Sequence, residues 1–256
     1  MCLIVFQYKT HPDYPLVLVA NRDERHDRPS LPIHFWKDAP DILAGRDLER
    51  LGGWLGISRS GRLAVLTNHP FTDWQTDLNS LSRGELVREF LSRSDSPAHY
   101  ALTLKDTRKH YDGYRLLFGD LDHLYLYSNV PGTCEHFPAG LHSVSNTEDD
   151  VSYHRRERGE MLVQDYLDHH STLQPEELIR LFQDTAPAPV LSTFPKGVPV
   201  EEAKRFSSIF VAGGEFGTVA TTVILVDKQG HVNVTEQRYG KEGPLELTKQ
   251  SFRLEK

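Results

Sequence analysis

Cysteine is scarce in this chain: among 256 residues there are two, Cys2 and Cys134. Two cysteines cannot build a disulfide framework, and their scarcity is typical of a reducing compartment. Long apolar runs are lacking as well, since none approaches the roughly 20 residues that a transmembrane helix needs. The first residues carry no positive leader, which disfavours a secretory signal. These absences predict a cytoplasmic protein that does not insert into a membrane.

Positive charge is in deficit. The chain has 29 Lys and Arg against 36 Asp and Glu, which gives a formal net charge of −7. A surface that binds duplex nucleic acid needs excess Lys and Arg to neutralise phosphates. The composition therefore disfavours nucleic acid as a partner. It does not indicate an oligomeric state.

Motifs that identify cofactor and metal enzymes are absent too. The sequence has no glycine-rich phosphate loop before a helix, no Gly-x-Ser-x-Gly elbow and no His-Glu-x-x-His. His169 and His170 are adjacent, so on a helix they point to different faces and disfavour a shared metal. The glycine-rich segment 213–217 lies between two strand signals and is interpreted as a turn. We therefore expect no required cofactor and no metal site.

Strand and helix signals come in blocks along the chain. Strands are predicted at 3–8, 16–20, 54–58, 63–67, 114–118, 124–127, 141–144, 206–211, 218–226 and 232–237. Helices are predicted after the capping box of Ser82 and Glu85, from Pro97, at about 152–169 and at 175–182. The Pro-rich segment 186–200 is expected to be a long loop, a candidate lid or substrate edge. This block order favours antiparallel sheets covered by helices, the α+β class, in a single domain over residues 1–256.

Cys2 is the residue whose position carries the most chemistry. If the initiator methionine is removed, Cys2 becomes the N-terminus, and its α-amino group, with an ordinary pKa of about 7.7–8.0, can serve as base for its own thiol. One residue then supplies both nucleophile and general base. The alternative is a cysteine at the start of a strand with no catalytic role.

Asn21, Arg22, Asp23 and Glu24 follow the apolar strand predicted at 16–20. In a hairpin, the end of the second strand lies beside the start of the first, so these residues are expected next to Cys2. Arg22 could lower the thiol pKa or hold a carbonyl or carboxylate, and Asp23 could bond the α-ammonium group. The alternative is a charged strand end with an exposed ion pair.

An ordered set of short motifs runs through nearly the whole chain and resembles the NRDE family, also called the transport and Golgi organization 2 family. The set is Met1-Cys2, Asn21-Arg22-Asp23-Glu24, Arg28-Pro29, Ala44-Gly45-Arg46-Asp47, Gly52-Gly53-Trp54-Leu55-Gly56, Thr67-Asn68, Ser82-Arg83-Gly84, the segment from Gly140 to Asn146, and Phe216-Gly217-Thr218. The specific part is the Met-Cys start combined with the tetrapeptide.

The resemblance implies an N-terminal-nucleophile (Ntn) hydrolase-like αββα four-layer sandwich, with two antiparallel sheets between helical layers. The family is distantly similar to cholylglycine hydrolases and penicillin V acylases. It implies Cys2 as nucleophile and base, Arg22 and Asp23 beside it, and Asn146 as an oxyanion-hole donor, a role worth about 2.7–4 kcal/mol. Substrate-binding roles are expected for a second set of residues: Asn21, Glu24, Asn68, Trp54 and His142.

One departure from the family pattern concerns the late segment, where Val219 stands at a position commonly occupied by Arg. Two functions therefore stay open, both with a small-molecule substrate or ligand. The first is a cysteine amidohydrolase acting on a non-peptide C–N bond. The second is a non-catalytic haem-binding or haem-trafficking protein that uses the same cleft, with Cys2 or His142 as the candidate iron ligand.

Overall fold

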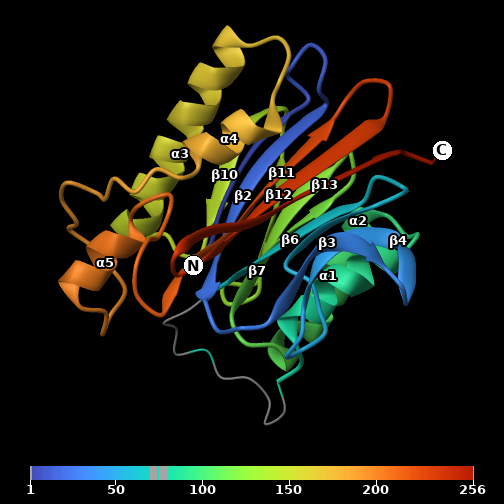
Figure 1. The fold of residues 1–256 in the computed structure, drawn as a ribbon. Helices are drawn as coiled ribbons and strands as arrows, with labels where there is room; N and C mark the ends of the chain where they lie inside the picture. The colour runs from blue at the N-terminus through green and yellow to red at the C-terminus, as the bar shows by residue number, and fades with distance from the viewer. Residues whose placement is uncertain (1, 70–73, 75–79, 256) are drawn as a thin grey trace. The chain divides into compact units, whose positions relative to one another are not determined.

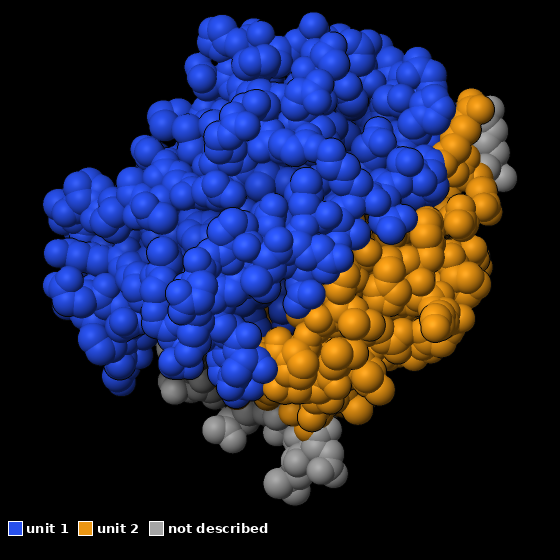
Figure 2. Space-filling view, in the orientation of Figure 1, with its two compact units in different colours: residues 1–27, 139–252 blue, residues 28–138, 253–256 orange. Residues whose placement is uncertain are grey.

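The computed structural model describes residues 2–69, 74 and 80–255, and its strands form two antiparallel sheets. The chain divides into two compact units (Figure 2). The first unit comprises residues 1–27 and 139–252, and the second comprises residues 28–138 and 253–256. Each unit combines one sheet with helices, which confirms the α+β class. The single domain expected over residues 1–256 stays a prediction.

The first unit contains a six-stranded sheet with the strand order β10-β1-β2-β11-β12-β13. Its strands are β1 (Cys2–Tyr8), β2 (Leu16–Arg25), β10 (Gly140–Ser145), β11 (Phe216–Val226), β12 (His231–Gly240) and β13 (Gly243–Arg253). Its helices are α3 (Asp150–His169), α4 (Pro175–Leu181) and α5 (Val200–Phe206). Helix α3 packs on β1 and β10, and α4 packs on β11 (Figure 1).

The core of the first unit forms where the helices meet one face of this sheet. Successive strand residues point to opposite faces, so Leu3 and Val5 of β1 face the same side and pack with Val163 of α3. Gly159 of α3 lies against these two strand residues: an added Cβ would stand 3.0 Å from Val5 Cγ2 and 3.2 Å from Leu3 Cδ2. The absence of a side chain at Gly159 therefore lets α3 approach β1 closely.

The second unit contains a seven-stranded sheet whose strands follow chain order from β3 to β9. These are β3 (Ser30–Trp36), β4 (Ala39–Asp47), β5 (Leu55–Ser58), β6 (Leu63–Asn68), β7 (Tyr114–Gly119), β8 (Leu124–Ser128) and β9 (Thr133–Phe137). Helix α1 (Arg83–Ser92) packs on β4, β5 and β6, and α2 (Pro97–Thr107), followed by a 3₁₀ turn at Arg108–His110, packs on β8. Trp36, Phe90, Tyr100 and Phe118 are among the buried side chains of its core.

The predicted strands differ from the structure at two informative places. The strand expected at 16–20 continues to Arg25, because β11 pairs with β2 along the polar tetrapeptide and satisfies its backbone. The strand expected at 206–211 is wrong. The hydroxyl groups of Ser207 and Ser208 donate to the carbonyls of Lys204 and Arg205, at 2.6 and 2.7 Å, and turn the chain at the end of α5.

Four strands escaped prediction: β3, β4, β9 and β13. Strands β9 and β13 are sheet edges that expose most of their side chains, so their sequences lack an apolar run.

The helix start at Ser82 differs from the predicted capping box. Among the described residues, the side chain of Ser82 makes no capping bond, and the Glu85 N–H donates to the backbone carbonyl of Ser82. In the described part of the chain, no helix is both long and apolar enough to cross a membrane.

Candidate active site

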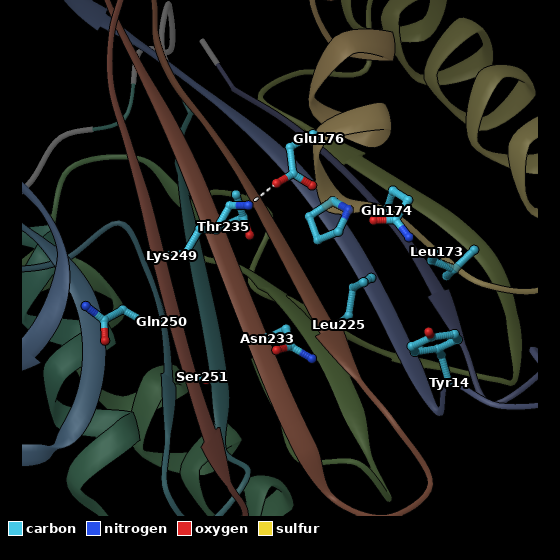
Figure 3. Close-up of a pocket in the computed structure, with 11 residues that line it drawn as sticks. Tyr14, Leu173, Gln174, Glu176, Leu225, Asn233, Thr235, Lys249, Gln250 and Ser251 are labelled. Atoms are coloured by element: carbon cyan, nitrogen blue, oxygen red, sulfur yellow. Dashed lines mark ion pairs between the residues drawn. The ribbon is translucent and has the colours of Figure 1, made fainter.

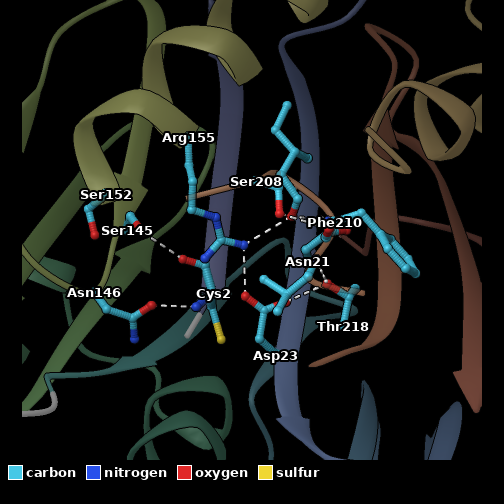
Figure 4. A network of polar contacts seen from close by, with 12 residues as sticks. Cys2, Asn21, Asp23, Ser145, Asn146, Ser152, Arg155, Ser208, Phe210 and Thr218 are labelled. Atoms are coloured by element: carbon cyan, nitrogen blue, oxygen red, sulfur yellow. Dashed lines mark hydrogen bonds and ion pairs between the residues drawn. The ribbon is translucent and has the colours of Figure 1, made fainter. Parts of the chain in front are cut away.

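Cys2 lies at the start of β1, an inner strand between β10 and β2. Its backbone N–H donates a hydrogen bond to Asn146 Oδ1, and its carbonyl accepts one from Ser145 Oγ at 2.9 Å (Figure 4). On the other side it is the direct cross-strand partner of Arg22. Cys2 is thus fixed by both neighbouring strands. Met1 lies outside the described residues.

Arg22 and Asp23 are neighbours in the tetrapeptide, and their side chains point to opposite faces of the six-stranded sheet. Direct cross-strand partners share a face, so Cys2 and Arg22 face one side. Asn21 and Asp23 alternate with Arg22 and face the helices: Asn21 Nδ2 donates to the carbonyls of Phe182 and Ile209, both at 3.0 Å. Arg22 is only 8% exposed and Asp23 only 3%, so neither is a solvated strand end.

Asp23 is the centre of a buried polar network (Figure 4). Its Oδ2 accepts a hydrogen bond from Arg155 Nη2 of α3 at 2.7 Å, and its Oδ1 accepts one from Thr218 Oγ1 of β11 at 2.7 Å. Thr218 Oγ1 in turn accepts the backbone N–H of Val211 at 2.9 Å. The Asp23 carboxylate therefore links its own strand, β2, to helix α3 and to strand β11.

Electrostatics at the sulfur act in opposing directions. Burial is the largest effect and raises the pKa of the Cys2 thiol above its ordinary value, and the negative charge of Asp23 raises this pKa further. Three effects lower the pKa: first the positive charge of the amino terminus, then the backbone N–H of Asp23, which donates to the sulfur, and the positive charge of Arg22. The sulfur therefore has thiolate-stabilising neighbours, but in the chain that still carries Met1 they do not outweigh burial.

The residues expected to be catalytic are thus brought together at one end of the first unit's sheet: Cys2, Arg22, Asp23 and Asn146. Their chemical roles stay predictions. Of those expected to bind substrate, Asn21 adjoins this site, and its amide also accepts the hydroxyl of Thr221 at 2.6 Å, which gives it a structural task. Glu24 lies two positions beyond Arg22 on β2.

His142 lies away from Cys2. It is the cross-strand partner of Phe6, with ring centroids 5.4 Å apart, four strand positions or roughly 13 Å from the start of β1. Asn68 ends β6 and Trp54 precedes β5, where its ring covers Gly45, and both belong to the second unit. Their roles as substrate contacts, and haem ligation by Cys2 or His142, stay predictions.

Val219 occupies a β-bulge. The pairing of β11 with β2 shifts register between Thr218, which is opposite Asp23, and Ala220, which is opposite Arg22. Val219 is therefore the extra residue of a β-bulge opposite the Arg22–Asp23 step. Its side chain is apolar, so this position brings no cation to the site.

Two cavities lie in the first unit, and Cys2 lines neither of them. One, of about 370 Å³, is crossed by the ion pair of Glu176 with Lys249 and is lined by residues such as Tyr14 and Asn233 (Figure 3). The other, of about 480 Å³, includes Thr218, which bonds Asp23. Within the described residues, no group of three or more His, Cys, Asp or Glu side chains could hold a metal ion.

Arg155 is the site residue that sequence reasoning missed. The buried residues of α3 follow helical spacing: Val151, Ser152, Arg155, Gly159, Val163 and Tyr166. An arginine on the same face as these apolar and small residues was an available signal, because a charged side chain at a buried helix position needs a partner.

The irregular segment 186–199 is anchored to the start of α3, since Asp150 Oδ2 accepts the backbone N–H groups of Ser192 and Thr193. Its role as a lid stays a prediction.

Comparisons with known proteins agree on family and fold. Residues 1–241 match the family model described as Transport and Golgi organisation 2. The human Transport and Golgi organization protein 2 homolog is 32% identical, over 93% of this chain and 92% of that protein. The bovine homolog is 30% identical over the full length of both chains.

Among solved structures, a conjugated bile acid hydrolase from Clostridium perfringens, crystallised as a mutant with alanine in place of the cysteine at position 2, superposes with a TM-score of 0.56. The match covers 99% of this chain and 92% of the hydrolase at 9% identity, so it shows a shared fold, which is the Ntn-hydrolase fold. The family model and the two mammalian relatives go further, and this chain belongs to the Transport and Golgi organisation 2 family.

Proposed function

We propose that this protein, once Met1 is removed, is a cysteine amidohydrolase that cleaves a non-peptide C–N bond, with Cys2 as its N-terminal nucleophile. The observation that carries the proposal is the setting of Cys2. Its nitrogen is bonded to Asn146, and its sulfur lies beside Arg22 and the Asp23 N–H, at the end of an inner strand. The related fold supports it, since the bile acid hydrolase is named as a hydrolase and has its natural cysteine at position 2.

The first half of the reaction forms a thioester. The Cys2 sulfur attacks the carbonyl carbon of the amide while its own α-amino group takes the thiol proton. A C–S bond forms and the carbonyl electron pair moves to oxygen. The tetrahedral intermediate then collapses, the C–N bond breaks, and the leaving amine takes the proton from the α-ammonium group. In the second half, the α-amine deprotonates a water that attacks the thioester, which releases a carboxylic acid and restores the thiol.

Asn146 is suited to stabilise the oxyanion. Its Oδ1 is engaged by the Cys2 nitrogen, and its Nδ2 points to the same side as the Cys2 sulfur (Figure 4). An N–H donor in that direction can bond the oxygen of an acyl group held at the sulfur. Arg22, the cross-strand partner of Cys2, supplies a cation on the same face. The thiolate therefore depends on Arg22, the Asp23 N–H and the new α-ammonium group.

The test is the state of the first two residues. Intact-mass measurement of protein made in cells should show the loss of one methionine. In that protein, p-nitrophenyl acetate should acylate Cys2 faster than Cys134, which is exposed on β9 and serves as an internal reference. An otherwise identical chain with an N-terminal extension, in which the Cys2 nitrogen is an amide without basicity, should lose this preference.

Two outcomes would contradict the proposal. One is retention of Met1 in the protein isolated from cells. The other is acylation of Cys2 that is no faster than that of Cys134 after Met1 has been lost. A conjugated bile acid is a first amide probe for turnover, because the structurally similar hydrolase is named for that substrate class. The cytoplasmic location expected from the cysteine content is a separate prediction.

A further inference from the structure

Arg155 is buried in an unusual way. Its side chain is 0% exposed, and its hydrogen bonds are made by Nη2 alone, to Asp23 Oδ2 at 2.7 Å and to the Ile209 carbonyl at 3.0 Å. Its Nε and Nη1 are buried and have no hydrogen-bond partner among the residues that the structure describes. A guanidinium group has five N–H donors, so most of this group's bonding capacity is unused there.

Stability does not explain this arrangement. Burying an ion pair removes two charges from water, and the attraction between them often fails to repay that cost unless the remaining donors are satisfied. Well-packed apolar residues of similar volume would serve the core of the first unit at least as well. The pair of Arg155 and Asp23 therefore calls for a role that an apolar pair could not fill.

The position of Asp23 supplies that role. Its carboxylate faces the helices, while its backbone N–H donates to the sulfur of Cys2. The carboxylate is held from two sides, by Arg155 on α3 and by Thr218 on β11. The N–H belongs to the peptide between Arg22 and Asp23, opposite the bulge at Val219, where β11 does not hold β2 in regular register. Contacts of the Asp23 side chain therefore add to the pairing of Arg22 with Cys2 in orienting this N–H.

We propose that Arg155 is a positioning residue of the Cys2 site: its ion pair with Asp23 holds the Asp23 backbone N–H against the sulfur and so favours the thiolate. This inference deepens the proposed function and rests on it. Arg155 touches neither substrate nor sulfur in this scheme, and it acts through Asp23. The other charged groups that bear on the sulfur are the amino terminus of the chain and Arg22 on β2, which lower the pKa of the thiol, and the Asp23 carboxylate itself, which raises it.

The experiment is the pH dependence of Cys2 alkylation by iodoacetamide, measured by peptide mass spectrometry with Cys134 of the same chain as reference. In Arg155→Met, the midpoint of the Cys2 profile should move upward, by on the order of one pH unit, because the Asp23 N–H loses its anchor and the Asp23 carboxylate loses the cation that neutralises it. Arg155→Lys keeps a charge for Asp23 and should restore most of the original midpoint. The Cys134 profile should not move.

The matched control is Arg158→Met. Arg158 lies on the same helix and pairs with Asp184, but a third of its side chain is exposed. That variant should leave the Cys2 midpoint unchanged.

A double variant shows whether Arg155 acts through Asp23. Asp23→Asn alone and Asp23→Asn with Arg155→Met should share one midpoint, because the second change has no carboxylate left to release. Each single variant leaves one buried charge unpaired, whereas the double variant leaves none. If a single variant does not fold, the double variant is compared with wild type, and its midpoint should lie above the wild-type one because the Asp23 N–H has lost its anchor. A midpoint that differs by more than half a unit between Asp23→Asn and the double variant would overturn the proposal. So would an Arg155→Met profile that overlays the wild-type one.

Failure of this inference is distinguishable from failure of the proposed function. Alkylation reports on the sulfur whether or not the protein hydrolyses an amide. Retained Met1 together with a shifted profile would refute the hydrolase and keep the positioning role. Preferential acylation of Cys2 together with an Arg155→Met alkylation profile that does not shift would keep the hydrolase and refute the positioning role.

Discussion

The amide of Asn146 combines two tasks in one side chain. Its Oδ1 holds the nitrogen of Cys2, and its Nδ2 points to the side of the sulfur. The side chain is completely buried, so its orientation is set by these bonds and by the packing around it. A buried donor that need not reorganise during the reaction is the kind that contributes most to oxyanion stabilisation.

We expect Asn146→Ala to separate acylation of Cys2 from its alkylation. Acylation by p-nitrophenyl acetate develops an oxyanion and should slow by about 10²–10³-fold, whereas alkylation by iodoacetamide develops none and should slow far less. Both rates are measured on separate aliquots of one preparation by peptide mass spectrometry, which distinguishes Cys2 from Cys134. Equal losses in the two rates would mean that Asn146 acts on the thiol or on the fold and does not serve as an oxyanion donor.

Helix α3 connects the core of the first unit to its candidate active site. At Gly159 it lies against Leu3 and Val5 of β1, and one turn earlier Arg155 reaches Asp23. Residues three or four apart share a helix face, so close packing at Gly159 also sets how far Arg155 extends over the sheet. The seating of one helix thus links the strand that carries Cys2 to the residue that we infer to position Asp23.

We expect Gly159→Ala to destabilise the protein by about 1 kcal/mol. Alanine favours the helix by about 1 kcal/mol over glycine, but overpacking of a buried contact costs about 1–3 kcal/mol. Val5 and Leu3 are both fully buried, so they cannot move aside into solvent. Urea unfolding followed by circular dichroism measures the change. Met161→Ala, at a 55% exposed position of the same helix, should be nearly neutral. A Gly159→Ala protein more stable than wild type would show that the contact is looser than the structure indicates.

The whole chain carries a net charge of −7. Its second unit, however, buries several neutral groups that can ionise at high pH, the hydroxyl groups of three tyrosines. Tyr100, Tyr114 and Tyr127 are each at most 1% exposed. The ring of Tyr100 packs with Phe118, and the rings of Tyr114 and Tyr127 pack with each other. Burial raises the pKa of Tyr100 and of Tyr114 well above the ordinary value of about 10. The folded protein therefore keeps these protons at a pH where the unfolded chain releases them.

Stability should consequently fall as the pH rises above about 10. Below that pH the tyrosines are protonated in both states and contribute no pH dependence; above it the unfolded state binds fewer protons, so the free energy of unfolding decreases. Each such tyrosine contributes up to about 1.4 kcal/mol per pH unit. Tyr100→Phe should reduce this alkaline slope, measured by urea unfolding between pH 8 and 11. Tyr125→Phe, which is partly exposed, is the control, and an unchanged slope in Tyr100→Phe would contradict the assignment.

Features that rest on neighbouring stretches of chain were predictable. The hairpin of β1 and β2 needs only two apolar runs and a turn between them, and it alone brings Cys2 opposite Arg22. The alternation of a strand then sends Asp23 to the other face. The α+β class likewise follows from the order of strand and helix signals. Edge strands such as β13 were missed because exposure on both faces removes the apolar pattern on which prediction depends.

The remaining parts of the site depend on segments that meet only in the folded chain. Arg155 lies 132 residues from Asp23 and Thr218 lies 195 residues away, and no local pattern states that their side chains will bond the two oxygens of one carboxylate. The bulge at Val219 decides which residue of β11 stands opposite Asp23, and it arises from the pairing of distant strands. Local backbone preference and hydrophobic periodicity are properties of the sequence. The partners of a buried charge are decided by packing, because a charge removed from water is stable only where the whole fold brings an opposite one to it.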